Sequence, residues 1–182
     1  DEVEKLLKEL EDLRRKTRED LERVKKELEE LVKRSKDRLR EAEDELRRLV
    51  EDIERVIRED REAREDIRRL VEELKKKVDD IRRTLEESNE ELRRKVERII
   101  RELERANRDV REKVKEVERR IKGDELKKRI RELVKEHTDE LRKVKRELEA
   151  LVEKATEDHE RVLRRLEELV ERIKREVDKA EK

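Results

Sequence analysis

The sequence predicts an all-α fold, an up-down-up antiparallel three-helix bundle of long, nearly straight helices of about 58 residues each. Its apolar residues recur in steps of 4, 4, 3, 4 and 3, a cycle of 18 residues over five turns. This spacing matches the 3.6-residue period of an unstrained α-helix, so the apolar stripe stays on one face with almost no supercoil. The stripe occurs three times, each time over three such cycles, which predicts three equal helices.

The composition also favours long helices. The chain of 182 residues is 64% charged and 30% hydrophobic, and it has no aromatic residue, no Pro, no Cys and a single Gly. High charge with low hydrophobicity is typical of disorder, but a disordered chain does not place its apolar residues on a strict helical lattice. We therefore interpret the whole chain, residues 1–182, as a single three-helix bundle.

Charge excludes several classes of function. Lys and Arg number 58, as do Asp and Glu, and both signs are interleaved along every exposed face. A nucleic-acid-binding protein concentrates basic charge on one face, so we expect no nucleic-acid partner. No apolar run approaches the roughly 20 residues that cross a bilayer, and no signal-peptide pattern is present. We expect no membrane partner and a soluble protein, cytoplasmic on recombinant expression, although the sequence leaves the compartment unknown.

The first helix is expected over about residues 1–59, because acidic Asp1 and Glu2 suit a helix N-terminus. Its apolar stripe runs through Val3, Leu6, Leu7, Leu10, Leu13, Thr17, Leu21, Val24, Leu28, Leu31, Ser35, Leu39, Ala42, Leu46, Leu49, Ile53 and Ile57.

The second helix is expected over about residues 62–121. Between Ile57 and Ile67 the lattice lapses apart from Ala63, and Asp60 can cap the next helix, so we place a short turn near residues 59–62. The junction contains no Gly or Pro, and a continuous helix would keep the stripe roughly in phase. In that alternative, the first two helices form one rod and two chains form a domain-swapped homodimer.

The third helix is expected over about residues 124–182. Gly123 stands where a left-handed C-terminal cap favours glycine, and Asp124 is the expected N-cap of the third helix.

The few uncharged polar residues and the two histidines fall at related positions. When the chain is folded about turns near residues 62 and 122, Thr17 meets Asn107, and Asn107 meets His137. The polar residues then gather in two layers, about 27 Å apart at 1.5 Å per residue. The first layer contains Thr17, Asn107, His137 and Thr138. The second contains Ser35, Ser88, Asn89, Thr156 and His159, with Thr84 one turn away.

We expect these layers to be structural hydrogen-bond networks that fix helix order and register. A buried polar group without a partner costs about 1–3 kcal/mol, and residues grouped in one layer can satisfy each other. His137 and His159 lie about 33 Å apart along one helix, so they cannot share a metal ion, and no HExxH pattern occurs. We expect no metal, no cofactor and no catalytic residue. A pH response remains an alternative, because protonating a buried imidazole turns its acceptor nitrogen into a donor.

The chain resembles the de novo, parametrically designed helical bundles. The resemblance rests on three equal helices, the 18-residue core repeat, the absence of aromatics, the balanced Glu, Lys and Arg surface and the Gly123–Asp124 loop. The polar layers resemble the designed hydrogen-bond networks of such bundles. The resemblance covers the whole chain but departs at the first junction, which lacks a loop glycine. It implies a very heat-stable scaffold with no natural substrate.

The sequence therefore predicts a structural scaffold that is no enzyme, forms a monomer and requires no partner. A coiled-coil interaction module that forms a swapped homodimer, and a bundle that responds to pH through His137 and His159, remain the alternatives.

Overall fold

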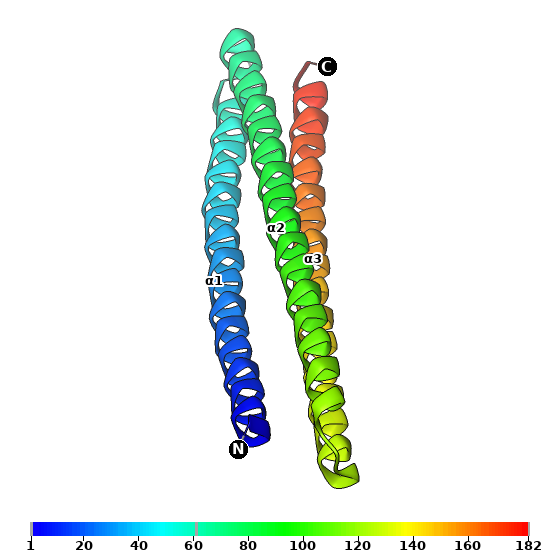
Figure 1. Cartoon of the computed structure of the whole chain (residues 1–182). Helices are drawn as coiled ribbons and strands as arrows, with labels where there is room; N and C mark the ends of the chain where they lie inside the picture. The colour runs from blue at the N-terminus through cyan, green and yellow to red at the C-terminus, as the bar shows by residue number, and fades with distance from the viewer. Residues whose placement is uncertain (1, 61, 182) are drawn as a thin grey trace. The chain divides into compact units, whose positions relative to one another are not determined.

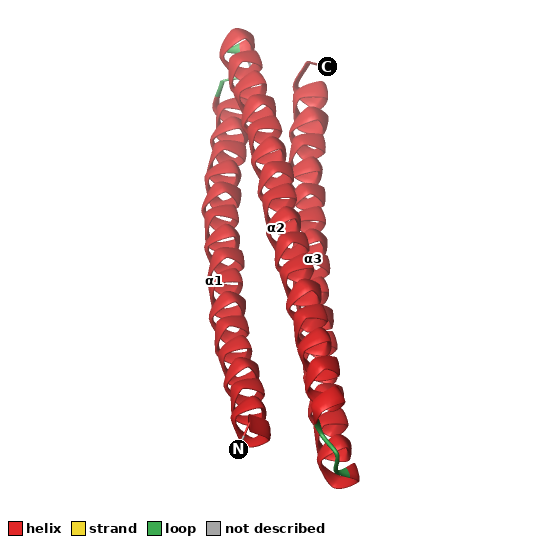
Figure 2. Cartoon of the chain, viewed as in Figure 1, coloured by secondary structure: helices red, strands yellow, loops and turns green. Residues whose placement is uncertain are grey.

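The computed structural model describes residues 2–60 and 62–181, with side chains from residue 4 onward. Over these ranges the chain forms three helices and no strand (Figures 1 and 2). They are α1 (Glu2–Glu59), α2 (Arg64–Arg120) and α3 (Asp124–Glu181). The predicted all-α three-helix fold is confirmed. The expected helix ends at Asp1 and Lys182, and the side chain of Val3, lie outside the described residues.

A turn joins α1 to α2, at the junction where the sequence left a continuous helix open. The backbone N–H of Ala63 donates to the carbonyl of Asp60 at 3.3 Å, and the Asp60 carboxylate accepts the N–H of Glu62 at 3.2 Å. The carbonyl of Ala63 then accepts the N–H of Ile67 at 3.1 Å, the first hydrogen bond of α2. Ala63 is therefore the N-cap of α2, because its carbonyl accepts the first helical hydrogen bond. Asp60 is not the N-cap, since its carboxylate accepts the N–H of Glu62 inside the turn.

The connection before α3 also differs from expectation by one position. The carbonyl of Gly123 accepts the N–H of Lys127 at 3.2 Å, so Gly123 is the N-cap of α3 and Asp124 is its first residue. Gly123 does not have a positive φ, so it does not form the expected left-handed C-cap. Glycine is also an acceptable N-cap, and the charge of Asp124 is favourable in the first helical turn.

The chain packs as two compact units, each with a segment of every helix. Unit 1 comprises Asp1–Glu30 and Leu92–Val152, and unit 2 comprises Leu31–Glu91 and Glu153–Lys182. The connection between α1 and α2 belongs to unit 2, and the connection between α2 and α3 belongs to unit 1. The single bundle expected over residues 1–182 stays a prediction.

Ion pairs between α1 and α3 keep one register inside each unit. Most of these pairs are 122 positions apart, including Arg18 with Glu140 and Lys25 with Glu147 in unit 1, and Lys36 with Asp158 and Glu43 with Arg165 in unit 2. Two further pairs, Arg14 with Glu140 at 126 and Glu54 with Arg172 at 118, lie one helical turn to either side of this register. A difference in residue number that varies by no more than one turn means that the two segments run parallel in each unit. This arrangement is the one that an up-down-up order requires of the first and third helices.

Apolar side chains from all three helices form the core of each unit. In unit 2 the most deeply buried include Leu46, Ile53, Leu74, Leu166 and Ile173, all at most 1% exposed. In unit 1 a cluster packs near the second connection, with Leu10, Val110, Val114, Val117, Ile121 and Ile130 as its buried members. Burial of this apolar surface is the main favourable term in folding, at about 25 cal/mol per Å².

One stripe residue and one charged residue depart from the sequence pattern. Leu13, predicted to face inward, is 36% exposed, whereas Glu43, beside the stripe, is only 6% exposed. No helix in the described part of the chain is long and apolar enough to cross a membrane.

Candidate functional site

His137 is the most buried of the polar residues singled out by sequence. It lies on α3 in unit 1 and is 3% exposed, and neither ring nitrogen has a hydrogen-bond partner within the protein. Burial lowers the pKa of His137 below its ordinary value of 6.5; Glu140 partly offsets this, while Arg14 and Arg18 lower the pKa further. The ring is therefore neutral at pH 7, with one nitrogen as donor and the other as acceptor.

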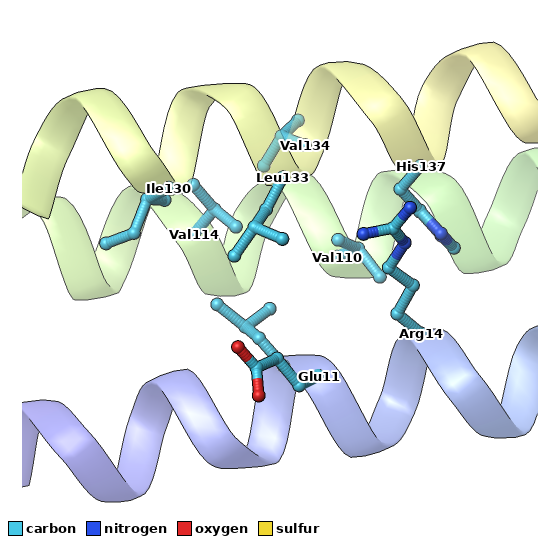
Figure 3. Close-up of a pocket in the computed structure, with 9 residues that line it drawn as sticks. Glu11, Arg14, Val110, Val114, Ile130, Leu133, Val134 and His137 are labelled. Atoms are coloured by element: carbon cyan, nitrogen blue, oxygen red, sulfur yellow. The ribbon is translucent and has the colours of Figure 1, made fainter.

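Arg14 reaches from α1 toward His137 and connects the two helices (Figure 3). Its two terminal nitrogens pair with Glu136 at 3.1 Å and with Glu140 at 2.9 Å, and Arg18 also binds Glu140. Burial raises the pKa of Glu140, but the hydrogen bonds from Arg14 and Arg18 outweigh it, so this pKa lies below 4.5. The Nε of Arg14 is buried without a partner in the protein.

A small cavity lies between the three helices of unit 1 beside these two side chains. It has a volume of about 20 Å³, and Figure 3 shows the residues that line it. Its walls are mainly apolar, with Val110 and Val114 from α2 and Ile130 from α3. The polar groups at its surface come from Arg14, His137 and Glu11.

The other three residues of the first predicted layer do not bond to His137. Thr138 donates to the Oδ1 of Asn107 across α2 and α3 at 3.4 Å, a long hydrogen bond. Both line a groove that is also lined by Arg111 and Arg142, away from the cavity at His137. The hydroxyl of Thr17 donates to the carbonyl of Leu13 in its own helix at 2.9 Å.

His159 is the buried histidine of unit 2, at 5% exposed. Its Nδ1 has no hydrogen-bond partner within the protein. Burial lowers the pKa of His159, and the charge of neighbouring Asp158 opposes this shift. Asp158 is itself paired with Lys36 of α1 at 3.1 Å, so the carboxylate is shared between the two neighbours.

The remaining residues of the second predicted layer occupy separate positions. Ser35, Ser88, Asn89 and Thr156 are half-buried, and Thr84 is exposed. Thr84 donates to the carbonyl of Asp80 in its own helix at 2.9 Å, and the Oδ1 of Asn89 is buried without a partner. Among the described residues, no hydrogen bond joins Ser35, Ser88, Asn89 and His159 to one another. The two networks therefore stay predictions, with the contact between Asn107 and Thr138 as one described link.

Sequence reasoning missed three charged residues: Glu43, which is buried, and Arg14 and Glu140, which lie beside a buried histidine. Arg14 and Glu140 cover His137, and Glu43 is buried in unit 2 between Arg47, at 3.3 Å, and Arg165, at 3.4 Å. Glu43 and Arg14 each directly follow a residue of the apolar stripe. Their position beside the stripe was the feature of the sequence that could have predicted that Glu43 is buried and Arg14 half-buried. Exposed Lys and Arg side chains next to a stripe commonly cover it with their aliphatic stems.

The arrangement offers little chemistry beyond packing and proton binding. Within the described residues, no group of three or more His, Cys, Asp or Glu side chains could hold a metal ion. The two histidines lie in different units, and the carboxylates closest to them are engaged by Arg or Lys.

Comparison with known proteins finds similarity to a solved structure but not to a known sequence or family. No protein-family model matches the chain, and no curated protein matches its sequence. A solved structure described as a computationally designed three helix bundle aligns over 99% of this chain and 86% of its own, with 17% sequence identity and a TM-score of 0.37.

Proposed function

We propose that the chain is a designed structural scaffold, without biochemical activity, in which the interior of each unit serves only to hold three helices in register. The register that most ion pairs between α1 and α3 share in both units carries this proposal. Lys25 with Glu147 in unit 1 and Lys36 with Asp158 in unit 2 keep the same separation, as an idealised repeat requires. Charged side chains at the helix surfaces thus reinforce the apolar stripe instead of forming a binding site.

Heat stability tests the scaffold proposal. Circular dichroism of the full chain at pH 7 should show helix retained above about 90 °C, the range of hyperstable proteins. A cooperative transition at about 45–65 °C, where natural mesophilic domains cluster, would contradict an idealised scaffold. Leu46→Ala is the matched control, because it removes side-chain volume from a site that is 1% exposed and should lower the transition temperature by about 4–20 °C.

The chain acts as a monomer in this proposal. The turn between α1 and α2, in which Ala63 and Glu62 donate hydrogen bonds to Asp60, allows these two helices of one chain to pack in the same unit. Light scattering on a size-exclusion column should give a mass near 22.6 kDa. A doubled mass would support the swapped homodimer instead. As a positive control, replacing residues 60–62 by three alanines, which precede Ala63, favours a continuous helix and should produce that doubled mass.

A second candidate function, a bundle that opens in acid, is favoured by one specific observation. His137 and His159 are both buried. Both ring nitrogens of His137, and the Nδ1 of His159, have no hydrogen-bond partner in the protein. The charged groups that face His137 are Arg14 and Arg18 from α1 and Glu140 from α3, while α2 contributes apolar Val110 and Val114 at the adjoining cavity.

The sign of the acid response follows from the direction of both shifts. Because the folded pKa of each histidine lies below the ordinary 6.5, the unfolded chain binds more protons over the interval between these values. The stability that the two neutral, buried histidines allow is therefore fully present above about pH 6.5. It decreases as the pH falls from 6.5 through the folded pKa of each histidine. Denaturant unfolding at pH 7 and pH 5 tests this. A His137→Leu/His159→Leu double variant should lose the dependence in this interval, and a parent chain equally stable at both values would eliminate the candidate.

A further inference from the structure

Two side chains at the cavity in unit 1, Arg14 and His137, carry buried nitrogen atoms that have no hydrogen-bond partner within the protein. The Nε of Arg14 carries a hydrogen that can only donate, and the neutral ring of His137 carries one donor and one acceptor. Both side chains line the cavity, one from α1 and the other from α3 (Figure 3). Leaving such groups unpaired costs about 1–3 kcal/mol each, so a guest that satisfies both is strongly favoured.

The volume of the cavity restricts the guest to a very small molecule. At about 20 Å³ it exceeds the roughly 10–15 Å³ that holds one water molecule. A ring-sized apolar guest needs about 150 Å³ and is excluded. A water molecule in a protein interior also needs at least two polar partners, and the side chains of Arg14 and His137 supply them.

The local charge argues against an ion as the guest. The positive charge of Arg14 is offset by Glu136 and Glu140, and Arg18 shares the second of these carboxylates. An anion would therefore meet no excess positive charge and would also meet the carboxylate of Glu11, whereas a cation would meet the N–H donors of Arg14 and His137. The remaining class is a neutral molecule that can both donate and accept.

We propose that this cavity binds one water molecule, which accepts a hydrogen bond from the Nε–H of Arg14 and donates one to the imidazole of His137. The water thereby joins α1 to α3 inside unit 1, below the ion pairs that Arg14 makes with Glu136 and Glu140. It satisfies the Nε–H of Arg14 and the acceptor nitrogen of the His137 ring, two of the three buried atoms that the protein itself leaves unpaired at this cavity. Because it lies between the three helices, displacing it changes the interior without changing the charged surface.

Nuclear magnetic resonance on the isotope-labelled full chain tests the site with water itself as the probe. A long-lived water should give cross-relaxation peaks to the ring protons of His137. Val114→Ile places an additional methyl group at the cavity wall and should remove these peaks. Val96→Ile is the matched control, because Val96 is also a buried α2 valine, lies 18 residues away and does not line the cavity. In that variant the water peaks at His137 should persist.

A second pair of variants keeps the test decisive if Val114→Ile disturbs folding. Arg14→Met removes the Nε–H donor but retains a long apolar stem, so the water peaks should be lost. Arg18→Met removes another charge bound to Glu140 without altering the cavity, so the peaks should remain. Absence of a peak at His137 in the parent chain, or its survival in both Val114→Ile and Arg14→Met, would overturn the proposal.

Discussion

The two segments of α1 share one apolar lattice but are buried to different depths. In residues 4–30, which belong to unit 1, only Leu10 and Leu28 are buried, whereas residues 31–59 of unit 2 contain six buried side chains. Adjacent apolar pairs explain part of the difference, because Leu49–Val50 and Val56–Ile57 widen the stripe in unit 2. The helical period thus determines which face turns inward, and the local apolar content determines how firmly that face is held.

The largest expected effect is a difference between two leucine substitutions in α1. Leu46→Ala in unit 2 removes a side chain that is 1% exposed and should lower the free energy of unfolding by about 2–5 kcal/mol. Leu13→Ala in unit 1 truncates a side chain that is 36% exposed and should cost less than about 1 kcal/mol. Denaturant titration of both variants measures the two losses, and equal losses would remove the distinction between the units.

Lowering the pH should lower the free energy of unfolding through the buried histidine of each unit, His137 in unit 1 and His159 in unit 2. Each buried histidine should cost up to about 1.4 kcal/mol of stability per pH unit between 6.5 and its folded pKa. Replacing only His137 or only His159 with leucine should halve the slope of stability against pH. Unfolding free energies at half-unit pH steps give these slopes, and a full slope in either single variant would show that the other histidine alone titrates.

Smaller effects should follow from the N-caps of α2 and α3. Ala63→Ser in unit 2 introduces a side-chain oxygen at a cap where alanine is among the poorest residues, and should add about 1 kcal/mol. Gly123→Ser in unit 1 replaces a residue that already caps acceptably, so its gain should be a few tenths of a kcal/mol. Thermal unfolding of the two variants should reveal this order, and the opposite order would contradict the assigned caps.

The sequence predicted the three helices and the second connection because periodicity and the single glycine are local signals. At the first junction, which has no Gly or Pro, it favoured a turn but left a continuous helix open. It did not predict that Leu13 is exposed, since exposure depends on side chains contributed by the neighbouring helices. It also placed the caps at Asp60 and Asp124, one to three residues from Ala63 and Gly123, because several residues near a helix start can serve as the cap. Hydrogen bonds in the polar layers depend on rotamers and on shifts of about 1 Å, which a repeat of 18 residues does not specify.

Hydrogen exchange of the native chain measures the difference between the two segments of α1 most directly. Amides in residues 4–30 should exchange through openings of lower free energy than amides in residues 31–59, because fewer buried contacts hold the first segment. Mass spectrometry of peptides from the two segments, labelled at pH 7, resolves them within one helix. Slower exchange in residues 31–59 is the predicted result. Equal protection along the whole of α1, or slower exchange in residues 4–30, would contradict the account.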